Sequence, residues 1–378
     1  MPIEPSKTPI YLDYNASTPI DPAVIEVMCP LLEGAYGNPS SGHWASAPAK
    51  VALDHARAEV AILLDCASDE IVFTSGGSEA NNLALKGLFF ARGDRPAHLV
   101  TSQIEHPAIL APARFLERFG ATVTYVPVDG NGLVDPDEIR KAITRDTFLI
   151  SIMHANNEVG TIQPIAESAR IAREHGIPLH TDAAQSVGKI ATKVRALGVD
   201  LLSVAGHKLY APKGIGALYI RRGIAIEPLI HGAGHEGGRR AGTESVLLAA
   251  ALGKACEIAE GRTGMPAALR LRDELWGGLR STFGGRVILN GHPERRLPNT
   301  LNVSFVGHVG AEILKRMPDV AASTGSACRT DEISLSPVLK AMGVSPEVGT
   351  GAIRFSLGRG TTRQEIEAVV DQLRRVLA

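Results

Sequence analysis

The sequence is poor in cysteine, and this shortage limits the classes of protein to which it can belong. The 378 residues include four cysteines, at positions 29, 66, 256 and 328. None of them forms a CxxC pair, and their spacing suits neither a disulfide scaffold nor a common zinc motif. We therefore expect reduced thiols and a cytoplasmic location.

Net charge and long apolar runs are also missing. Lys and Arg number 39 and Asp and Glu 40, which gives a net charge of −1, so we expect no nucleic-acid or anionic membrane partner. No apolar run approaches the roughly 18 residues of a membrane helix, and residues 246–252 are expected to form a buried helix face. The start, MPIEPSKTPI, has no charged segment before an apolar run, so no signal peptide is expected. These patterns favour an enzyme of small metabolites.

The order of sequence patterns predicts an α/β protein with two domains. Between residues 71 and 220, short apolar runs end in Gly-rich or polar corners and are often followed by helical stretches, as in EIVFTSGGSEANNLALKG. Such alternation predicts a mostly parallel sheet covered by helices, with ligands at the carboxyl ends of its strands. After about residue 261, amphipathic helices and half-buried strands predict a smaller α+β domain. We expect an arm over residues 1–20, a large domain over 21–260 and a small domain over 261–378.

Two polar corners in the large domain carry a possible chemistry. Asp182 in HTDAAQ ends one apolar run, and Lys208 in AGHKLYAPKG ends the next, 26 residues later. Alone, Asp182 is more simply a helix N-cap and Lys208 a solvated surface lysine. Together they are the pair that a pyridoxal phosphate enzyme needs, a lysine for the Schiff base and an acid against the pyridinium nitrogen. SGGSEANN, with Gly77 and Ser78, offers backbone N–H groups to a phosphate.

Nine motifs in order make the chain resemble a known family. They are YLDYNASTP, FTSGGSEANNLALKG, SQIEHPA, MHANNEVG, HTDAAQSVGK, GHKLYAPKGIGALY, AGTES, STGSAC and IRFSLGR. This set resembles the cysteine desulfurases of the class V aminotransferase family, to which selenocysteine lyases are close relatives. The resemblance implies a homodimer of the fold-type-I pyridoxal phosphate-dependent transferases, with a mostly parallel seven-stranded sheet in the large domain and a smaller C-terminal α+β domain.

The resemblance also implies roles for the residues around the cofactor ring. Lys208 would form the Schiff base and move the proton at the substrate α-carbon. Asp182 would pair with the pyridinium, Gln185 would hydrogen-bond the phenolic oxygen, and His106 would stack on the ring and exchange protons. Singly, His106 is also explained as a strand-end histidine bonded to backbone groups.

Further roles concern the phosphate and the substrate. Gly77, Ser78 and His207 would hold the phosphate, and Thr243 would reach the phosphate of the other subunit. Asn157 would contact the cofactor or the substrate carboxylate, and Arg354 would clamp that carboxylate with its planar fork. The structural alternatives are that Asn157 caps the following turn and that Arg354 forms a surface ion pair. No metal ligand set is expected.

Cys328 lies in TGSACRTDE, a small and polar stretch that is unlike an apolar core segment. In the resembling family this is a mobile loop whose cysteine is the nucleophile, and the segment RTDEISLS resembles the long-loop group that serves iron–sulfur assembly and tRNA thiolation. The alternative is a surface cysteine without a role. Cys29, Cys66 and Cys256 have helix-like apolar surroundings and are expected to be inert core thiols.

The resemblance therefore predicts an enzyme that converts L-cysteine to L-alanine and keeps the sulfur as a persulfide on Cys328. Its partners would be a second copy of the chain and a sulfur acceptor such as an iron–sulfur scaffold or a thiolation enzyme. Three alternatives stay open: a selenocysteine lyase acting on L-selenocysteine, a class V aminotransferase in which Cys328 is incidental, and a non-catalytic sulfur carrier.

Some features depart from this family pattern or point elsewhere. Ala205 stands where relatives often carry a serine before GHK, which removes one hydroxyl from the expected phosphate site. GAGHEGG, from Gly232, matches the GxGxxG pattern of dinucleotide binding, but the acid that would complete it, Glu257, lies inside an apparent helix. We therefore reject a dinucleotide site. His175 and His180 flank a Pro-containing turn and have no further ligands for a metal.

Overall fold

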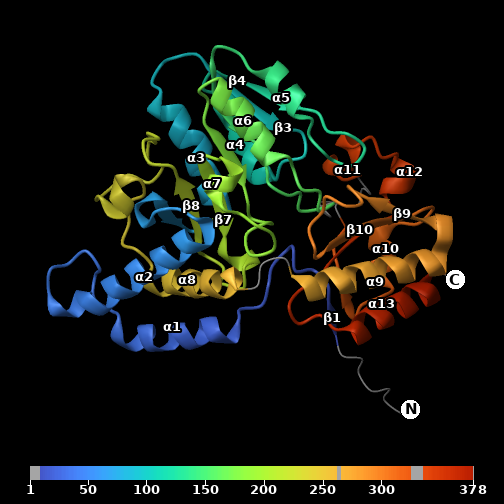
Figure 1. The fold of residues 1–378 in the computed structure, drawn as a ribbon. Helices are drawn as coiled ribbons and strands as arrows, with labels where there is room; N and C mark the ends of the chain where they lie inside the picture. The colour runs from blue at the N-terminus through green and yellow to red at the C-terminus, as the bar shows by residue number, and fades with distance from the viewer. Residues whose placement is uncertain (1–8, 262–264, 325–334, 378) are drawn as a thin grey trace.

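A seven-stranded sheet with helices on both faces lies beside a smaller sheet in the computed structural model, which describes residues 9–261, 265–324 and 335–377 (Figure 1). The strands of the large sheet are β2 (Ile71–Thr74), β3 (Ala97–Ser102), β4 (Ala121–Val126), β5 (Thr147–Ser151), β6 (Leu179–Asp182), β7 (Leu201–Ala205) and β8 (Gly216–Ile220). Their order across the sheet is β2-β8-β7-β6-β5-β3-β4.

Only β8 runs against its neighbours in this sheet. It pairs antiparallel with both β7 and β2, while the other adjacent strands pair in parallel. The carboxyl ends of β2, β3, β5, β6 and β7 therefore meet at one edge, which is where ligands bind in such sheets. The mostly parallel seven-stranded sheet that the sequence predicted is confirmed.

Consecutive residues of the strands face two separate apolar cores, as the pleat of a strand requires. On β2, Val72 belongs to one core and Phe73 to the other, and on β7 the same holds for Leu201 and Leu202. Both faces of the sheet must therefore be covered, and the helices supply the covers. The helices of the first core are α3 (Gly77–Ala91) and α4 (Pro107–Glu117), and those of the second include α2 (Ala47–Leu64), α5 (Pro136–Ala142), α6 (Ile165–Glu174), α7 (Val194–Leu197) and α8 (Val246–Glu260).

Three helices at one end of the molecule pack together. α8 contacts both α2 and α1 (Pro22–Gly34), and the three lie together below the sheet in Figure 1. Most of residues 246–252 are buried at the start of α8, as the sequence predicted.

The smaller sheet is antiparallel and has the order β12-β10-β9. Its strands are β9 (Val287–Asn290), β10 (Thr300–Phe305) and β12 (Ala352–Ser356). α9 (Pro266–Phe283) and α13 (Arg363–Val376) pack against each other, and their core includes residues of this sheet. Thr362 is the N-cap of α13 and forms a capping box with Glu365.

The N-terminal segment pairs with two segments of the smaller half. β1 (Ile10–Tyr11) lies parallel to β11 (Val320–Ala321), and Asp13 forms a bridge with Ser356 of β12. The short helices of this half are α10 (Gly310–Lys315), α11 (Pro337–Ala341) and α12 (Pro346–Gly349). The division into an arm, a large domain and a small domain stays a prediction.

A fourth apolar cluster joins the two halves close to the strand ends. Ile104 follows β3 and Met153 follows β5. Both pack with Val338 and Leu339 of α11 and with Met342, which directly follows that helix. Searched over the described residues, the chain has no helix that is long and apolar enough to cross a membrane.

Candidate active site

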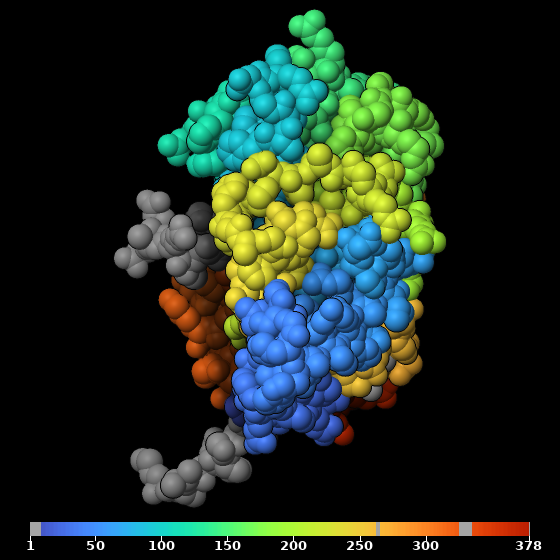
Figure 2. All heavy atoms as spheres, turned by 90° about the vertical axis from the view of Figure 1, so that its left-hand side faces the viewer, coloured from blue at the N-terminus to red at the C-terminus, as the bar shows by residue number. Residues whose placement is uncertain are grey.

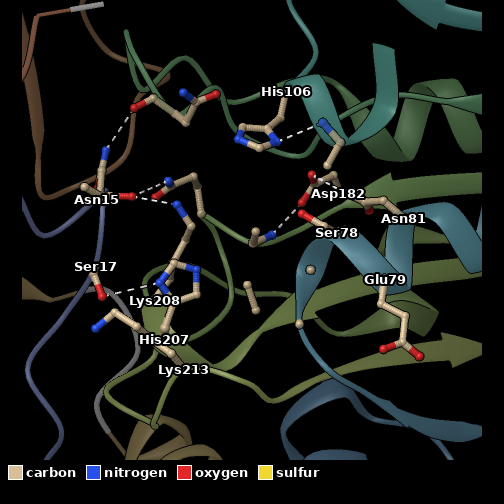
Figure 3. Close-up of a pocket in the computed structure, with 18 of the residues that line it drawn as sticks. Asn15, Ser17, Ser78, Glu79, Asn81, His106, Asp182, His207, Lys208 and Lys213 are labelled. Atoms are coloured by element: carbon tan, nitrogen blue, oxygen red, sulfur yellow. Dashed lines mark hydrogen bonds between the residues drawn. The ribbon is translucent and has the colours of Figure 1, made fainter. Parts of the chain in front are cut away.

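A cavity of about 640 Å³ opens where the carboxyl ends of the parallel strands meet the N-terminal segment and β12 (Figure 3). Its lining brings together most of the site residues that the sequence predicted. They are Gly77, Ser78, His106, Asn157, Asp182, Gln185, His207, Lys208 and Arg354. Thr243 is exposed and does not line this cavity, and Cys328 lies outside the described residues.

Lys208 ends a single 3₁₀ turn, η3 (Gly206–Lys208), that directly follows β7. Its Nζ donates to the carbonyl oxygen of Asn15 at 2.7 Å. Burial is the main reason why the pKa of the Lys208 amine falls to about 8, and repulsion from Arg354 adds to it. An amine with a pKa of about 8 is partly neutral at neutral pH, so it can act as a nucleophile or take up a proton.

Asp182 is the last residue of β6 and is only 6% exposed. Its two carboxylate oxygens accept hydrogen bonds from Asn81 Nδ2 at 2.7 Å and from the backbone N–H of Ala184 at 2.9 Å. The second bond closes a turn, and no helix begins at Asp182, so the simpler interpretation of this residue as a helix N-cap is wrong. Among the described residues it has no ion pair, so this buried acid lacks the cationic partner that burial calls for.

Two histidines at the cavity are kept neutral by their surroundings. His106 caps α4, and its Nδ1 accepts from the N–H of Ala108 at 3.1 Å, which leaves Nε2 for other partners. Burial is the main reason why the pKa of His106 is lowered. Attraction to Asp182 opposes this shift, and repulsion from Lys208 adds to it. Burial likewise lowers the pKa of His207 to about 4. Neutral rings suit stacking and hydrogen bonding rather than a fixed positive charge.

The N-terminus of α3 forms the opposite side of the cavity from Lys208 and Asn15 (Figure 3). Gly76 precedes this helix with φ +151°, a conformation that L side chains rarely adopt. A Cβ on Gly77 would lie 3.1 Å from the Cβ of Ala205, so the backbone closely approaches the end of β7. Ala205 thus occupies the place beside the helix start where a serine was expected. The free N–H groups of the first turn and the helix dipole favour an anion here.

Arg354 reaches the cavity from β12 of the smaller sheet. Its two terminal nitrogens donate to the carbonyl oxygen of Asn157 at 2.9 Å and to the carboxylate of Asp13 at 2.6 Å. Its Nε is buried and has no hydrogen-bond partner within the described residues. A guanidinium has five N–H donors, so the terminal nitrogens of Arg354 have further donors for an acceptor such as a carboxylate.

Sequence reasoning missed the residue that ties these elements together. Asn15 is 1% exposed and contacts Lys208, Gln185 and Lys189 of the large half as well as Thr300 of β10. The motif YLDYNASTP was recognised, but nothing in its local pattern shows that an asparagine between β1 and α1 meets Lys208. Only the folded chain brings them together.

Two glutamates near the cavity, Glu105 and the partly buried Glu158, were also not predicted. Glu105 lies just before His106, is fully buried, and accepts from the Ser102 hydroxyl at 2.7 Å and the Met153 N–H at 2.9 Å. Burial raises the pKa of Glu105 to about 8 and that of Glu158 to about 7. Both carboxyls therefore hold protons at pH values where exposed glutamates are ionised.

The structure corrects one expectation about the cysteines and agrees with another. Cys29 is exposed on α1, where only Val24 is buried, so the prediction that it is a core thiol is wrong. Cys256 is buried in α8 as expected, and Cys66 is partly buried. Burial raises the pKa of the Cys66 thiol to about 12. It also raises the pKa of Cys256, so neither thiol is a ready nucleophile.

The rejected motifs form other structures. GAGHEGG contains a short 3₁₀ element, η4 (His235–Gly238), which is separated from β8 by an irregular segment over residues 221–234, and Glu257 lies within α8. His180 is enclosed in β6 between the hydroxyls of Ser151 and Ser203. Over the described part of the chain, no group of three or more His, Cys, Asp or Glu side chains could hold a metal ion.

Comparison with known proteins adds an independent observation. Residues 10–369 match the family model described as aminotransferase class-V. The chain is 47% identical over 375 residues to a cysteine desulfurase IscS of Dictyoglomus turgidum, and this match covers 98% of the chain and 95% of the relative.

Solved structures with related names share the fold. A NifS-like protein superposes with a TM-score of 0.91 at 38% identity, over 98% of this chain and 99% of the other. A second structure, of SspA in complex with cysteine, gives a TM-score of 0.83 at 39% identity, over 92% of this chain and 98% of the other.

Proposed function

The chain belongs to the aminotransferase class-V family, and we propose that it is a pyridoxal phosphate-dependent cysteine desulfurase that converts L-cysteine to L-alanine and takes the sulfur as a persulfide on Cys328. The observation that carries this proposal is the cavity in which the Lys208 amine, the buried Asp182 carboxylate and the N-terminus of α3 face one another. A covalently held, protonated and phosphorylated cofactor needs these three groups.

The residues present fit pyridoxal phosphate, the cofactor that the family implies. Asp182, buried without an ion pair in the described residues, is placed to hold a protonated ring nitrogen. The N–H groups of Gly77 and Ser78 would bind the phosphate, with His207 beside them. When bound, the cofactor supplies an electron sink for the pair of electrons left at the substrate α-carbon.

The remaining groups of the cavity bind and orient. Gln185 would donate to the phenolic oxygen, and His106 would cover the ring with its neutral imidazole. The Lys208 amine, with a pKa of about 8, would hold the cofactor and then move the proton at the substrate α-carbon. Arg354 and Asn157 would position the substrate carboxylate, with the terminal nitrogens of Arg354 as donors.

Sulfur transfer needs a soft nucleophile, and we assign this role to Cys328. Its thiolate forms an S–S bond with the substrate Sγ while the bond between that sulfur and the β-carbon breaks. The electron pair of the broken bond stays with the carbon skeleton, which takes up protons and leaves as alanine. A thiol reductant or an acceptor protein then removes the outer sulfur of the persulfide.

We also propose that the working form is a homodimer, joined through the face shown in Figure 2. α1 buries only Val24 and exposes Leu32, and the neighbouring segment exposes Tyr36, Trp44 and Val51 by 74%, 81% and 68%. An apolar face of this kind marks an interface. Thr243 is exposed and belongs to the segment before α8, which is drawn in yellow beside the blue N-terminal residues in Figure 2. Its expected role toward a second subunit requires a position of this kind.

The finer proposals concern the partners and the compartment. The sulfur acceptor would be an iron–sulfur scaffold or a thiolation enzyme, and the cytoplasm would keep Cys328 reduced between turnovers. Support comes from the IscS name of the relatives and from the long polar segment after Cys328.

The first test measures alanine and sulfide together from L-cysteine and a thiol reductant, with Cys328→Ala beside the wild-type protein. Equal amounts of both products, lost in the variant, are expected. Products unchanged in the variant would contradict the role of Cys328 and leave the cofactor site standing. A yellow protein without either product would instead be tested with L-selenocysteine and for transamination to a keto acid.

A further inference from the structure

A buried lysine behind the cavity has no assigned role. Lys189 follows β6 by seven positions, is 5% exposed and does not line the cavity itself. Among the described residues it forms no ion pair, although burying an amine without one is costly. Its retention next to Lys208 and Gln185 therefore needs an explanation.

The Lys189 amine donates two hydrogen bonds, which is the number of hydrogens on a neutral amine. Lys189 Nζ donates to Gln185 Oε1 at 2.9 Å and to Asn15 Oδ1 at 3.1 Å. Burial lowers the pKa of Lys189 well below its ordinary value, and repulsion from Lys208 and Arg354 adds to this. A neutral amine carries two hydrogens, and both are used on amide oxygens.

These two bonds favour one orientation of each amide, and for Asn15 a bond of 3.1 Å from Asn299 Nδ2 to the same Oδ1 acts in the same sense. Because their oxygens face Lys189, their nitrogens must face elsewhere. Gln185 Nε2 donates at 2.9 Å to the Asn15 carbonyl oxygen, which also accepts from Lys208 at 2.7 Å. Asn15 Nδ2 donates to the Thr300 hydroxyl at 2.8 Å. The two ends of an amide have almost the same shape, so only such partners decide its orientation.

We propose that Lys189 is a positioning residue that fixes the amides of Gln185 and Asn15, so that the Gln185 nitrogen is presented to the cavity beside the Lys208 amine. This inference rests on the proposed function, because Gln185 needs a donor there only if it bonds an oxygen of the cofactor. Lys189 itself touches neither cofactor nor substrate. It acts through Gln185, since without it Gln185 Oε1 has no donor among the described residues and only the bond from Nε2 to the Asn15 carbonyl oxygen orients the amide.

The test is a double-mutant cycle of Lys189→Met and Gln185→Met, read from the absorbance of the bound cofactor as pH is varied. Methionine keeps most of the lysine length and removes its donors. In Lys189→Met, loss of one oriented donor should shift the titration midpoint by about half a unit or more and raise the cofactor Kd about tenfold. Gln185→Met should do the same, and the double variant should show no further change.

A structural role gives a different pattern. If Lys189 only fills space, Lys189→Met lowers the melting temperature while the titration midpoint stays, or its spectral effect adds to that of Gln185→Met. Either result would overturn the proposal. Lys193→Met is the matched control, because Lys193 is exposed and bonded to Glu260, and its midpoint should equal that of the wild-type protein.

Two further measurements cover other failures. If Lys189→Met does not fold, Lys189→Leu replaces it, because leucine also removes both donors and adds no charge; a folded variant with an unchanged midpoint would contradict the proposal. Melting temperatures of the cofactor-free proteins of the cycle test the contact without any cofactor, and non-additive losses are expected. A protein that binds the cofactor but releases no alanine or sulfide contradicts the proposed function only, and the cycle still decides the role of Lys189.

Discussion

The interior of the large sheet and its carboxyl edge both bury polar groups, but they treat them differently. In the interior, both ring nitrogens of His180 bond the hydroxyls of Ser151 and Ser203 at 2.9 Å. At the edge, Asp182 has no ion pair within the described residues, and Arg354, which reaches the cavity from β12 of the smaller sheet, has an unused Nε. Complete pairing stabilises the sheet, whereas incomplete pairing leaves groups ready for a ligand.

The same contrast holds for the basic groups of the two regions. The fully buried His180 has a pKa lowered to about 4, so it stays neutral throughout the physiological range. Lys208 has a pKa lowered only to about 8, which lets it change its protonation state during turnover. Burial is the main cause of both shifts, and the lysine ends near neutral pH because its ordinary pKa of 10.5 is higher than the 6.5 of histidine. The following predictions test this division between structural and reactive polar groups.

The largest effect is expected at Lys208. Lys208→Ala removes the amine that would hold the cofactor and move the proton, so alanine and sulfide production should fall to background and the yellow absorbance should be lost. Lys193→Ala, which removes an exposed lysine, should leave both unchanged. Wild-type turnover in Lys208→Ala would show that the edge of the sheet is not the reactive region.

A smaller loss is expected for Arg354→Lys, which keeps the charge and removes the planar fork. The substrate carboxylate then loses an oriented charged hydrogen bond, so kcat/KM should fall about tenfold to 100-fold, mainly through KM. The cofactor absorbance should stay. Arg222→Lys, in an exposed pair with Asp69, is the matched control and should behave as the wild-type protein. An unchanged KM in Arg354→Lys would remove Arg354 from the substrate site.

The sequence predicted the reactive edge better than the contacts that support it. Motifs such as HTDAAQ and GHKLY lie at strand ends, and parallel strands bring their carboxyl ends together, so Asp182 and Lys208 were predicted to be close. The contacts of Asn15 and Lys189 depend on how the N-terminal segment crosses the strand ends, which no local pattern encodes. The prediction for Cys29 was wrong because apolar neighbours in the sequence indicate a helix but do not show which of its faces the rest of the chain covers.

The sheet interior should be sensitive to acid. The pKa of His180 is lower in the folded than in the unfolded chain, so the unfolded chain binds more protons between about pH 6.5 and 4. The free energy of unfolding therefore falls as the pH is lowered through that window. The contribution of His180 is of the order of 3 kcal/mol. In His180→Gln, which cannot become charged, urea unfolding at pH 7 and pH 5 should differ less than in the wild-type protein. An equal difference would assign the acid sensitivity to other groups.

The smallest effect is expected at Glu105, a carboxyl at the edge that resembles the interior in being buried and hydrogen-bonded. Its pKa is raised to about 8, so it is mostly protonated at pH 7 and Glu105→Gln should change the free energy of unfolding by less than about 1 kcal/mol. Glu105→Ala removes the acceptor of the Ser102 hydroxyl and the Met153 N–H and should cost about 2 kcal/mol or more.

The pH dependence gives this last prediction its sign. The folded chain binds the Glu105 proton more tightly than the unfolded chain, so the stabilisation by this proton is complete below the ordinary glutamate pKa and is lost as pH rises through about 8. At pH 9 the wild-type protein must bury a carboxylate, and Glu105→Gln should then be the more stable of the two in urea unfolding. A wild-type protein that gained stability relative to Glu105→Gln between pH 7 and pH 9 would show that Glu105 is already ionised. Glu105 would then belong with Asp182 among the charged groups of the edge rather than with the neutral groups of the interior.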